Sequence, residues 1–264
     1  MNAQDDLARF RLDGRVALVS GGAGGIGSRL SLALARAGAR VTIVDRSAER
    51  ANEVAETIAA AGSEALVVLA DVTTTAGADR AATETVARFG RLDIEVNAVG
   101  GLPTEAMHPA EAYTEADWDR VLDLNLRSTL LASAAAARAM IAGGRGGRVL
   151  HISSVRGQLG INKEFAAYVA AKGAINALTR QQATEWARYG ITVNAIAPTF
   201  VATAQVAELL SDAAFKESLL ARIPLGRIGS TDDLVGAVIF FCSDAASFVT
   251  GQILTIDGGL TATQ

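Results

Sequence analysis

The sequence predicts an α/β fold in which about seven parallel strands form one doubly wound sheet flanked by helices. Short β-branched runs alternate along the chain with longer, alanine-rich segments of helical period, which is the pattern of repeated strand–helix–strand units. The short runs are apolar at nearly every position, as expected for strands that helices cover on both faces. No linker-like stretch interrupts the alternation, so residues 1–264 are expected to form a single domain.

The same alternation gives the expected elements in order. The strands are expected at Val16–Ser20, Arg40–Asp45, Ala65–Ala70, Leu92–Asn97, Arg148–Ser153, Thr192–Ala197 and Gln252–Ile256. The helices are expected at Gly25–Ala37, Ser47–Ala61, Ala76–Phe89, Thr114–Ala142, Glu164–Tyr189, Thr203–Ala221 and Asp232–Cys242. Residues 1–13 remain as an N-terminal tail. Within the fourth helix, the alanine-rich run Leu130–Ala142 permits close helix packing, so we expect an interface helix there.

Composition disfavours several classes of partner and cofactor. The net charge is −4 and aromatic residues make up only 5% of the chain, which argues against nucleic acid as a partner. Cys242 is the only cysteine, and the two histidines, His108 and His151, lie far apart, so no disulfide and no metal site are expected. The acidic start of the chain is unlike a secretory signal, and no apolar run is long enough to span a bilayer. The expected location is cytoplasmic.

A glycine-rich turn joins the first expected strand to the first helix. Glycines in the run Ser20–Gly27 let the backbone turn tightly and approach a pyrophosphate, whose charge the helix N-terminus meets. Asp45 ends the next strand 18 residues after Gly27, close to the spacing at which an acid binds the adenosine ribose and repels a 2′-phosphate. The sequence therefore predicts a Rossmann-type site for NAD, with NADP less favoured, although the neighbouring Arg46 complicates that choice. The expected cofactor residues here are Gly21, Gly25, Ile26, Gly27, Asp45 and Arg46.

A second and a third cluster suggest acid–base chemistry. Tyr168 and Lys172 share one face of an expected helix at i,i+4 spacing. A cation about 5 Å from a phenol is expected to lower the phenol pKa by about 2 units, toward the range useful for proton transfer. Ser154 ends the preceding strand, where open α/β sheets place their ligand crevice. Taken alone, the helix pair also fits an ordinary surface pair, and the serine also fits a plain cap.

Taken together, these clusters resemble the short-chain dehydrogenase/reductase family over nearly the whole chain. The resemblance implies a catalytic set of Asn125, Ser154, Tyr168 and Lys172, in which the tyrosine exchanges a proton with a secondary alcohol. It also implies that Lys172 binds the nicotinamide ribose and that Asn125 positions a proton-relay water. The remaining cofactor contacts that the resemblance implies involve Asp71, Val72, Asn97, Gly100, Tyr168, Lys172, Pro198, Val201 and Thr203.

The chain also departs from the family pattern. Ala98 and Val99 alter the motif at the sheet centre, and Thr199 stands where glycine is usual. Ser154 and Tyr168 lie 14 residues apart, one more than is usual in the family, and the extra residue is expected in the loop Gly157–Phe165 that faces the substrate.

The resemblance is nearest to members that act on sugar acids and polyols, such as gluconate and galactitol dehydrogenases. It implies a small-molecule substrate, a homotetramer and a mobile substrate lid at residues 203–222. Polar loop residues that meet substrate hydroxyls or a carboxylate, or that are simply solvated, are Arg156, Gln158, Asn162 and Lys163. Two other functions stay open: a 3-oxoacyl-carrier-protein reductase and a non-catalytic dinucleotide-binding regulatory protein.

Overall fold

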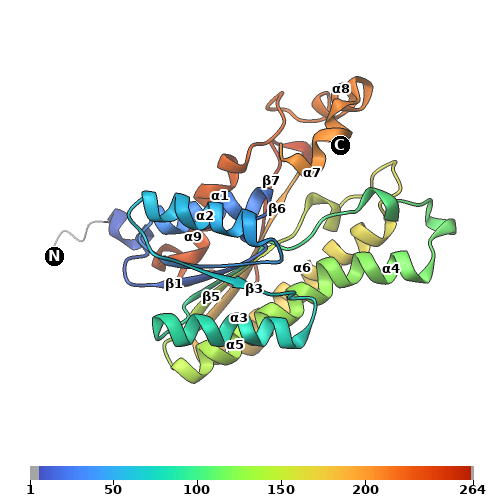
Figure 1. The fold of residues 1–264 in the computed structure, drawn as a ribbon. Coiled ribbons are helices and arrows are strands. Elements are labelled where there is room, and N and C mark those ends of the chain that lie inside the picture. Colours follow the sequence, from blue (N-terminus) through green and yellow to red (C-terminus); the bar gives the residue numbers. More distant parts are fainter. Residues whose placement is uncertain (1–5, 263–264) are drawn as a thin grey trace.

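The structure, a computed structural model, describes residues 6–262 apart from the side chains of residues 205 and 208. One 7-stranded sheet with the strand order β3-β2-β1-β4-β5-β6-β7 forms its centre, and every neighbouring pair of strands is parallel. The strand order reverses between β1 and β4, which is the point where ligands bind in doubly wound sheets. The predicted Rossmann-type fold is confirmed (Figure 1).

The strands lie where the apolar runs predict them, with differences of one or two residues at some ends. Their bounds are β1 Val16–Ser20, β2 Arg40–Asp45, β3 Ala65–Leu69, β4 Ile94–Asn97, β5 Gly147–Ile152, β6 Ile191–Pro198 and β7 Ile253–Ile256. The expected start of β4 is two residues too early. The reason is Asp93, whose carboxylate accepts from the backbone N–H of Val16 at 2.9 Å and belongs to a polar edge of the sheet.

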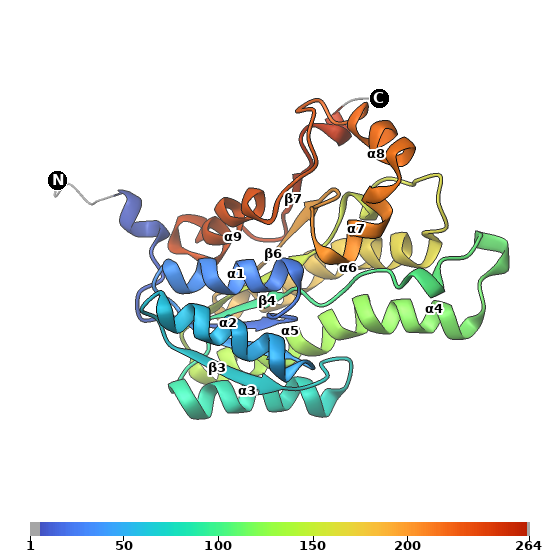
Figure 2. The same ribbon diagram turned by 45° about the horizontal axis from the view of Figure 1, so that its top comes forward.

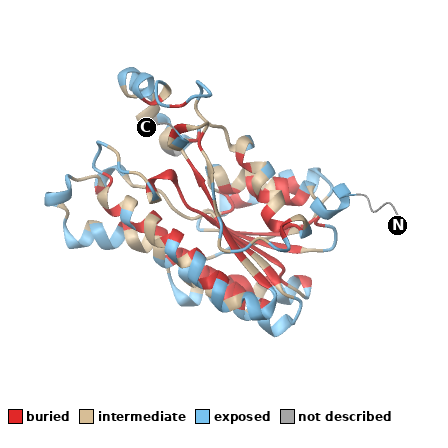
Figure 3. Ribbon diagram, turned by 180° about the vertical axis from the view of Figure 1, so that it is seen from behind, coloured by how far each residue is buried: buried red, intermediate tan, exposed pale blue. Residues whose placement is uncertain are grey.

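Helices cover both faces of the sheet. On one face lie α1 (Gly25–Arg36), α2 (Ala48–Ala60) and α9 (Val235–Cys242), and on the other lie α3 (Thr75–Phe89), α5 (Ser128–Gly143) and α6 (Ala166–Trp186) (Figure 1). Each layer has its own apolar core against the sheet. Figure 3 shows buried residues along the strands and on the helix sides that face them. In residues 6–262 no helix is long and apolar enough to cross a membrane.

The single helix expected at Thr114–Ala142 is wrong. The chain forms α4 (Glu115–Leu122), then a π-helical turn at Asp123–Arg127, and then α5. Hydroxyl side chains compete for the backbone carbonyls at this point: Thr129 Oγ1 donates to the carbonyl of Asn125 at 2.7 Å. Such π-turns often accompany functional sites, and here Asn125 lies within the turn.

The helix expected at Thr203–Ala221 is also divided. The chain forms α7 (Ala204–Ser211) and α8 (Ala213–Leu220), separated by Asp212 in an extended conformation. The Asp212 carboxylate accepts from the backbone N–H groups of Ala214 and Phe215, so it caps α8 and ends the preceding helix. In Figure 2, α7 and α8 lie beyond the carboxyl ends of β6 and β7.

Both ends of the chain differ in detail from expectation. Residues 1–5 of the expected tail lie outside the described residues, whereas Asp6–Phe10 form a 3₁₀ turn and Leu12 is fully buried. The helix expected at Asp232–Cys242 begins as a 3₁₀ turn at Thr231–Leu234 before continuing as α9.

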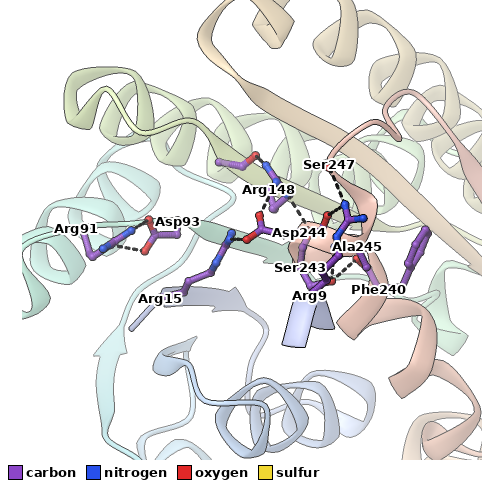
Figure 4. Close-up of polar contacts among 11 residues, drawn as sticks. Arg9, Arg15, Arg91, Asp93, Arg148, Phe240, Ser243, Asp244, Ala245 and Ser247 are labelled. Carbon is purple, nitrogen blue, oxygen red and sulfur yellow. Dashed lines mark hydrogen bonds and ion pairs between the residues drawn. The ribbon is translucent and has the colours of Figure 1, made fainter. Parts of the chain in front are cut away.

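The amino ends of the strands are closed by ion pairs (Figure 4). Asp244 pairs with Arg15 at 2.6 Å and with Arg148 at 3.2 Å. Beside them, Arg91 donates to both oxygens of Asp93, at 2.7 and 2.6 Å. Because these charges pair with one another, this edge offers no unmatched polar groups among the residues drawn. The residues that the sequence predicts for chemistry gather at the opposite edge.

Candidate active site

A cavity of about 420 Å³ lies at the carboxyl ends of the strands. Its walls come from the segments that follow β1, β4, β5 and β6, together with α6 and α7. The predicted site residues that line it are Gly25, Ile26, Gly100, Ser154, Tyr168, Lys172, Pro198, Val201 and Thr203. Segments far apart in the sequence thus meet where the fold class predicts a ligand.

The glycine turn is built so that side chains are excluded from it. A Cβ at Gly27 would lie 2.0 Å from the carbonyl oxygen of Gly21, and a Cβ at Gly25 would lie 2.9 Å from Thr203 Cβ. Gly21 itself has φ +70°, a conformation that favours glycine. No side chain caps the N-terminus of α1 at Gly24, so its N–H groups are available to an anion. These features fit a dinucleotide pyrophosphate.

Asp45 ends β2 beside this turn. Its Oδ2 accepts from Ala23 N at 3.3 Å, and its Oδ1 accepts from the N–H groups of Arg46 and Ser47 at 2.8 and 3.0 Å. The Asp45 side chain is 11% exposed, and Arg50 Nη2 lies 3.8 Å from its Oδ1. A carboxylate at this position fits a ribose diol, while the nearby guanidinium groups reduce its repulsion of a phosphate.

Two further predicted cofactor contacts, Asp71 and Val72, follow β3. Asp71 Oδ1 accepts from the backbone N–H and the hydroxyl of Thr73, at 3.0 and 2.7 Å, which contributes to a lowered Asp71 pKa. The exposed Arg46 guanidinium lies 3.8 Å from Asp71 Oδ2. Val72 is buried beneath this turn. Asp45, Arg46 and Asp71 therefore form one charged cluster where strands β2 and β3 end.

Lys172 and Tyr168 project from the first turns of α6 into the cavity. Lys172 Nζ donates to the carbonyl of Ile152 at 2.9 Å and lies 5.5 Å from the centroid of the Tyr168 ring. Burial lowers the pKa of Lys172 to about 8. The ammonium is therefore anchored to the end of β5 and titrates close to neutral pH.

The Tyr168 phenol differs from the sequence expectation. Burial raises its pKa, because excluding water disfavours the phenolate, and a hydrogen bond with Ser154 and the charge of Arg156 only partly oppose this. Lys172 is not among the groups that lower it. The expectation that Lys172 sets the phenol pKa is thus wrong for this arrangement of side chains, since the ammonium faces the ring and is itself poorly solvated.

Ser154 is fixed by the turn that it begins. Its hydroxyl accepts from Arg156 N at 3.1 Å, capping the 3₁₀ turn Val155–Gly157, and donates to the carbonyl of Pro198 at 3.4 Å. The turn is tied to α6 because Asn176 donates to the carbonyl of Gly157 at 3.3 Å. These contacts hold the serine hydroxyl beside the Tyr168 phenol.

Asn125 lies in the π-turn and is fully buried. Its side-chain oxygen accepts from Gly101 N at 3.0 Å, and its nitrogen donates to the carbonyls of Gly101 and Val121 at 2.8 and 2.9 Å. A Cβ at Gly100 would lie 2.7 Å from Asn125 Oδ1 and 3.2 Å from Lys172 Nζ. The Asn125 side chain therefore fixes the backbone at Gly100 and Gly101, close to the Lys172 ammonium.

Asn97 is a predicted cofactor residue that does not line the cavity and whose side chain is held in a buried network. Its Nδ2 donates to Glu95 Oε2 and lies 3.0 Å from His151 Nδ1, while its Oδ1 accepts from the hydroxyl of Ser20 at 3.2 Å. The chain of contacts continues from His151 Nε2 to Gln182 Oε1 at 2.9 Å. Sequence reasoning missed this buried network; the signal was a glutamate and a histidine in otherwise apolar strands.

The network gives Glu95 an unusual titration. Burial raises its pKa well above 4.5, and burial lowers the pKa of His151 to about 4, so both side chains are favoured in their neutral forms. Between pH 4.5 and the raised value, the folded chain holds a proton that the unfolded chain has released. The contribution of Glu95 to stability therefore falls as pH rises through this window.

Glu95→Gln is expected to raise Tm, and to raise it more at pH 7 than at pH 4.5, because burial raises the pKa of the carboxyl that the substitution removes. The amide still accepts from Asn97 but has no proton to lose. Thermal denaturation at pH 4.5 and pH 7 measures this, with the exposed Glu56→Gln in α2 as control. An equal Tm difference at both pH values would contradict it.

Two further lining groups have no hydrogen-bond partner in the described part of the chain. The hydroxyl of Thr199, where the family pattern has glycine, is buried and unpartnered. Arg156 is 2% exposed, and its Nε and Nη2 atoms likewise lack partners. Sequence reasoning treated Arg156 as one of several polar loop residues and did not predict its burial. No cluster of metal-ligating side chains occurs within residues 6–262.

Comparison with known proteins gives the family. A family model described as enoyl-(acyl carrier protein) reductase matches residues 21–261. The chain is 38% identical to the 2-dehydro-3-deoxy-D-gluconate 5-dehydrogenase of Escherichia coli, over 97% of this chain and 99% of that protein. It is 38% identical to the galactitol 2-dehydrogenase of Cereibacter sphaeroides over 253 residues, which cover 96% of this chain and 97% of that protein.

A solved structure agrees with these matches. The gluconate 5-dehydrogenase of Burkholderia cenocepacia, crystallised with NADP and tartrate, superposes with a TM-score of 0.90 at 41% identity, covering 98% of this chain and 99% of that one. Matches of this extent cover both the glycine turn and the cavity. The chain belongs to the short-chain dehydrogenase/reductase family and is a nicotinamide-dependent oxidoreductase that acts on a secondary alcohol or its ketone.

Proposed function

We propose that the protein oxidises one secondary hydroxyl of a polyol or sugar acid and transfers the hydride to NAD. The observation that carries the proposal is the convergence of Ser154, Tyr168 and Lys172 on the cavity that the glycine turn borders. The relatives named above act on sugar acids or on galactitol, which supports this substrate class. Polar and charged groups among the lining residues suit a hydroxylated molecule.

In the proposed mechanism, Tyr168 removes the proton of the substrate hydroxyl. Ser154 donates its hydroxyl hydrogen to the substrate oxygen in place of the Pro198 carbonyl and so orients that oxygen toward Tyr168. The nicotinamide cofactor supplies the hydride acceptor when it is bound. Lys172, protonated below its pKa of about 8, would donate to the nicotinamide ribose, and Asn125 holds the nearby backbone at Gly101 through its hydrogen bonds.

A substrate panel tests this function. Polyols, sugar acids, 3-oxoacyl thioesters and 2-enoyl thioesters are assayed with both cofactors by absorbance of the reduced nicotinamide. We expect activity with sugar acids or polyols. Activity confined to the 3-oxoacyl thioesters would instead favour a 3-oxoacyl-carrier-protein reductase, and cofactor binding without any turnover would favour a regulatory protein.

The proposed cofactor preference rests on Asp45, whose carboxylate fits the adenosine ribose and opposes a 2′-phosphate. NADP remains the alternative cofactor, because the Burkholderia relative was crystallised with NADP. Asp45→Asn should raise the ratio of kcat/KM for NADP to that for NAD at least about tenfold, because one charged hydrogen-bonding group is lost while Arg46 and Arg50 remain. Glu49→Gln in the first turn of α2 is the control. An unchanged ratio would refute the role of Asp45.

We further propose a cytoplasmic homotetramer with a mobile lid at residues 203–222. Support for assembly comes from exposed apolar side chains on α4 and α5, among them Trp118, Leu130 and Ile141. Support for the lid comes from Val206, Leu209 and Asp212, which line the cavity from α7 and the break after it. Light scattering that gives the mass of a monomer would refute the assembly.

A further inference from the structure

Arg156 is a buried cation held in place by the turn after β5. Its Nη1 donates to the carbonyl of Gly160 at 2.8 Å, and its backbone N–H donates to Ser154. Its other two polar atoms, Nε and Nη2, are buried and have no partner. A buried guanidinium that leaves two donors unpaired destabilises the protein unless a ligand completes its hydrogen bonds.

The charges around Arg156 do not neutralise it. Burial lowers the pKa of Arg156, the charge of Arg222 just after α8 lowers it further, and the Tyr168 phenol acts in the other direction. Asp212 lines the same cavity, but its Oδ1 accepts from two N–H groups of α8. Among the described residues, no carboxylate forms an ion pair with Arg156. The site therefore carries an excess of positive charge.

The two unpaired donors have a specific geometry. Nε–H and Nη2–H leave the same edge of the guanidinium plane in parallel, which matches the two oxygens of a carboxylate. Arg156 lines the same cavity as Tyr168 and lies two positions after Ser154 in the sequence. A ligand bound at both places would carry a carboxylate a few carbons from its reacting hydroxyl.

We propose that Arg156 binds a carboxylate of the substrate through Nε and Nη2, so that the substrate is a hydroxy acid of the sugar-acid class and not a neutral polyol. This inference rests on the proposed function and narrows its substrate class. The Phe200 ring lies 6.0 Å from Arg156 Cζ and packs on Phe215 of α8 with ring centroids 5.6 Å apart. These contacts link the guanidinium to α8, so a movement of the proposed lid at residues 203–222 would open it to the acid.

The kinetic test compares gluconate with two neutral counterparts of the same skeleton, gluconamide and D-glucitol, and with 6-phosphogluconate. Wild-type protein, Arg156→Gln and Arg156→Lys are assayed, together with Arg180→Gln, which removes one positive charge from an exposed position of α6 that does not line the cavity. Arg156→Gln should lower the ratio of kcat/KM for gluconate to kcat/KM for gluconamide at least about 30-fold, mainly through the KM for gluconate, because any effect of the Arg156 charge on Tyr168 is common to both substrates. Arg156→Lys should recover only part of the loss, and Arg180→Gln should resemble wild type.

Two measurements without turnover complete the test. Titration calorimetry should detect gluconate binding to the wild type with NADH present and not to Arg156→Gln. The Tm of Arg156→Gln should equal or exceed that of the wild type, because an unpaired buried charge is removed. A lower Tm with equal losses for acid and neutral substrates would mean that Arg156 is structural, and would overturn the proposal.

The outcomes separate this inference from the proposed function. Oxidation of neutral polyols by both proteins, with gluconate neither bound nor oxidised, overturns the carboxylate site and leaves the dehydrogenase intact. Gluconate binding that depends on Arg156, without oxidation of any panel member, supports the carboxylate site and refutes the proposed function. The enzyme could instead prefer 6-phosphogluconate, with Arg156→Gln abolishing that preference and leaving kcat/KM for gluconate unchanged. This result would assign Nε and Nη2 of Arg156 to a phosphate and overturn the proposal.

Discussion

Tyr168→Phe should lower kcat at least about 10³-fold, because the phenol hydroxyl is the only group of Tyr168 that exchanges a proton with the substrate. The ring remains, so its edge-to-face packing on Phe165, with centroids 6.1 Å apart, is retained. Binding of NADH should change less than about threefold for the same reason. Initial rates give kcat, and quenching of protein fluorescence gives the Kd for NADH.

A matched control for this variant is available in the loop before α4. The Tyr113 hydroxyl donates to the carbonyl of Glu164 at 3.2 Å, and Tyr113 does not line the cavity. Tyr113→Phe removes the same atom and should keep kcat within about threefold. Turnover by Tyr168→Phe close to that of Tyr113→Phe would refute the assignment of Tyr168 as the acid–base group.

Ser154→Ala should lower kcat by about 10² to 10³, the usual loss when a preorganised hydrogen-bond donor to a reacting oxygen is removed. Residual turnover is expected, because Tyr168 and Lys172 remain. The variant also loses the cap of the turn Val155–Gly157, so its Tm should be recorded with its rates.

Ser153→Ala provides the comparison for this second variant. The Ser153 hydroxyl donates to Asn176 Oδ1 at 2.6 Å and so ties β5 to α6. Its loss should lower Tm and leave kcat within about threefold. If Ser154→Ala raised KM and left kcat unchanged, Ser154 would bind substrate equally well in the ground and transition states, contrary to the proposed mechanism.

Features governed by local pattern were predictable from the sequence. Apolar runs located the strands, because a strand covered on both faces needs apolar residues at every position. The glycine turn was recognisable because a strand, a glycine cluster and a helix follow one another, and the sheet brings Ser154, Tyr168 and Lys172 together as expected. These predictions depended on the order of motifs along the chain and little on any single motif.

Features governed by tertiary contacts were not predictable. Helical period continues through Asp123–Arg127, and nothing in it indicates that the Asn125 amide bonds to Gly101 in the segment after β4 and lies in a π-turn. Asn97 matched its motif, but its amide is engaged by Glu95 and His151 from neighbouring strand positions. The buried Arg156 lies 6.0 Å from the Phe200 ring, which packs on Phe215 of α8, and the sequence pattern does not indicate either contact.

Transfer of deuterium from substrate to cofactor tests the central claim most directly, since the account requires hydride to pass between the two within one cavity. A substrate from the panel, deuterated at the carbon that bears the reacting hydroxyl, is incubated with the enzyme and NAD, and the reduced cofactor is analysed by mass spectrometry. We predict that the reduced cofactor carries the deuterium, that turnover is slower than with the protiated substrate, and that Tyr168→Phe forms almost none. Reduced cofactor without deuterium, or equal amounts from Tyr168→Phe and wild type, would contradict the account.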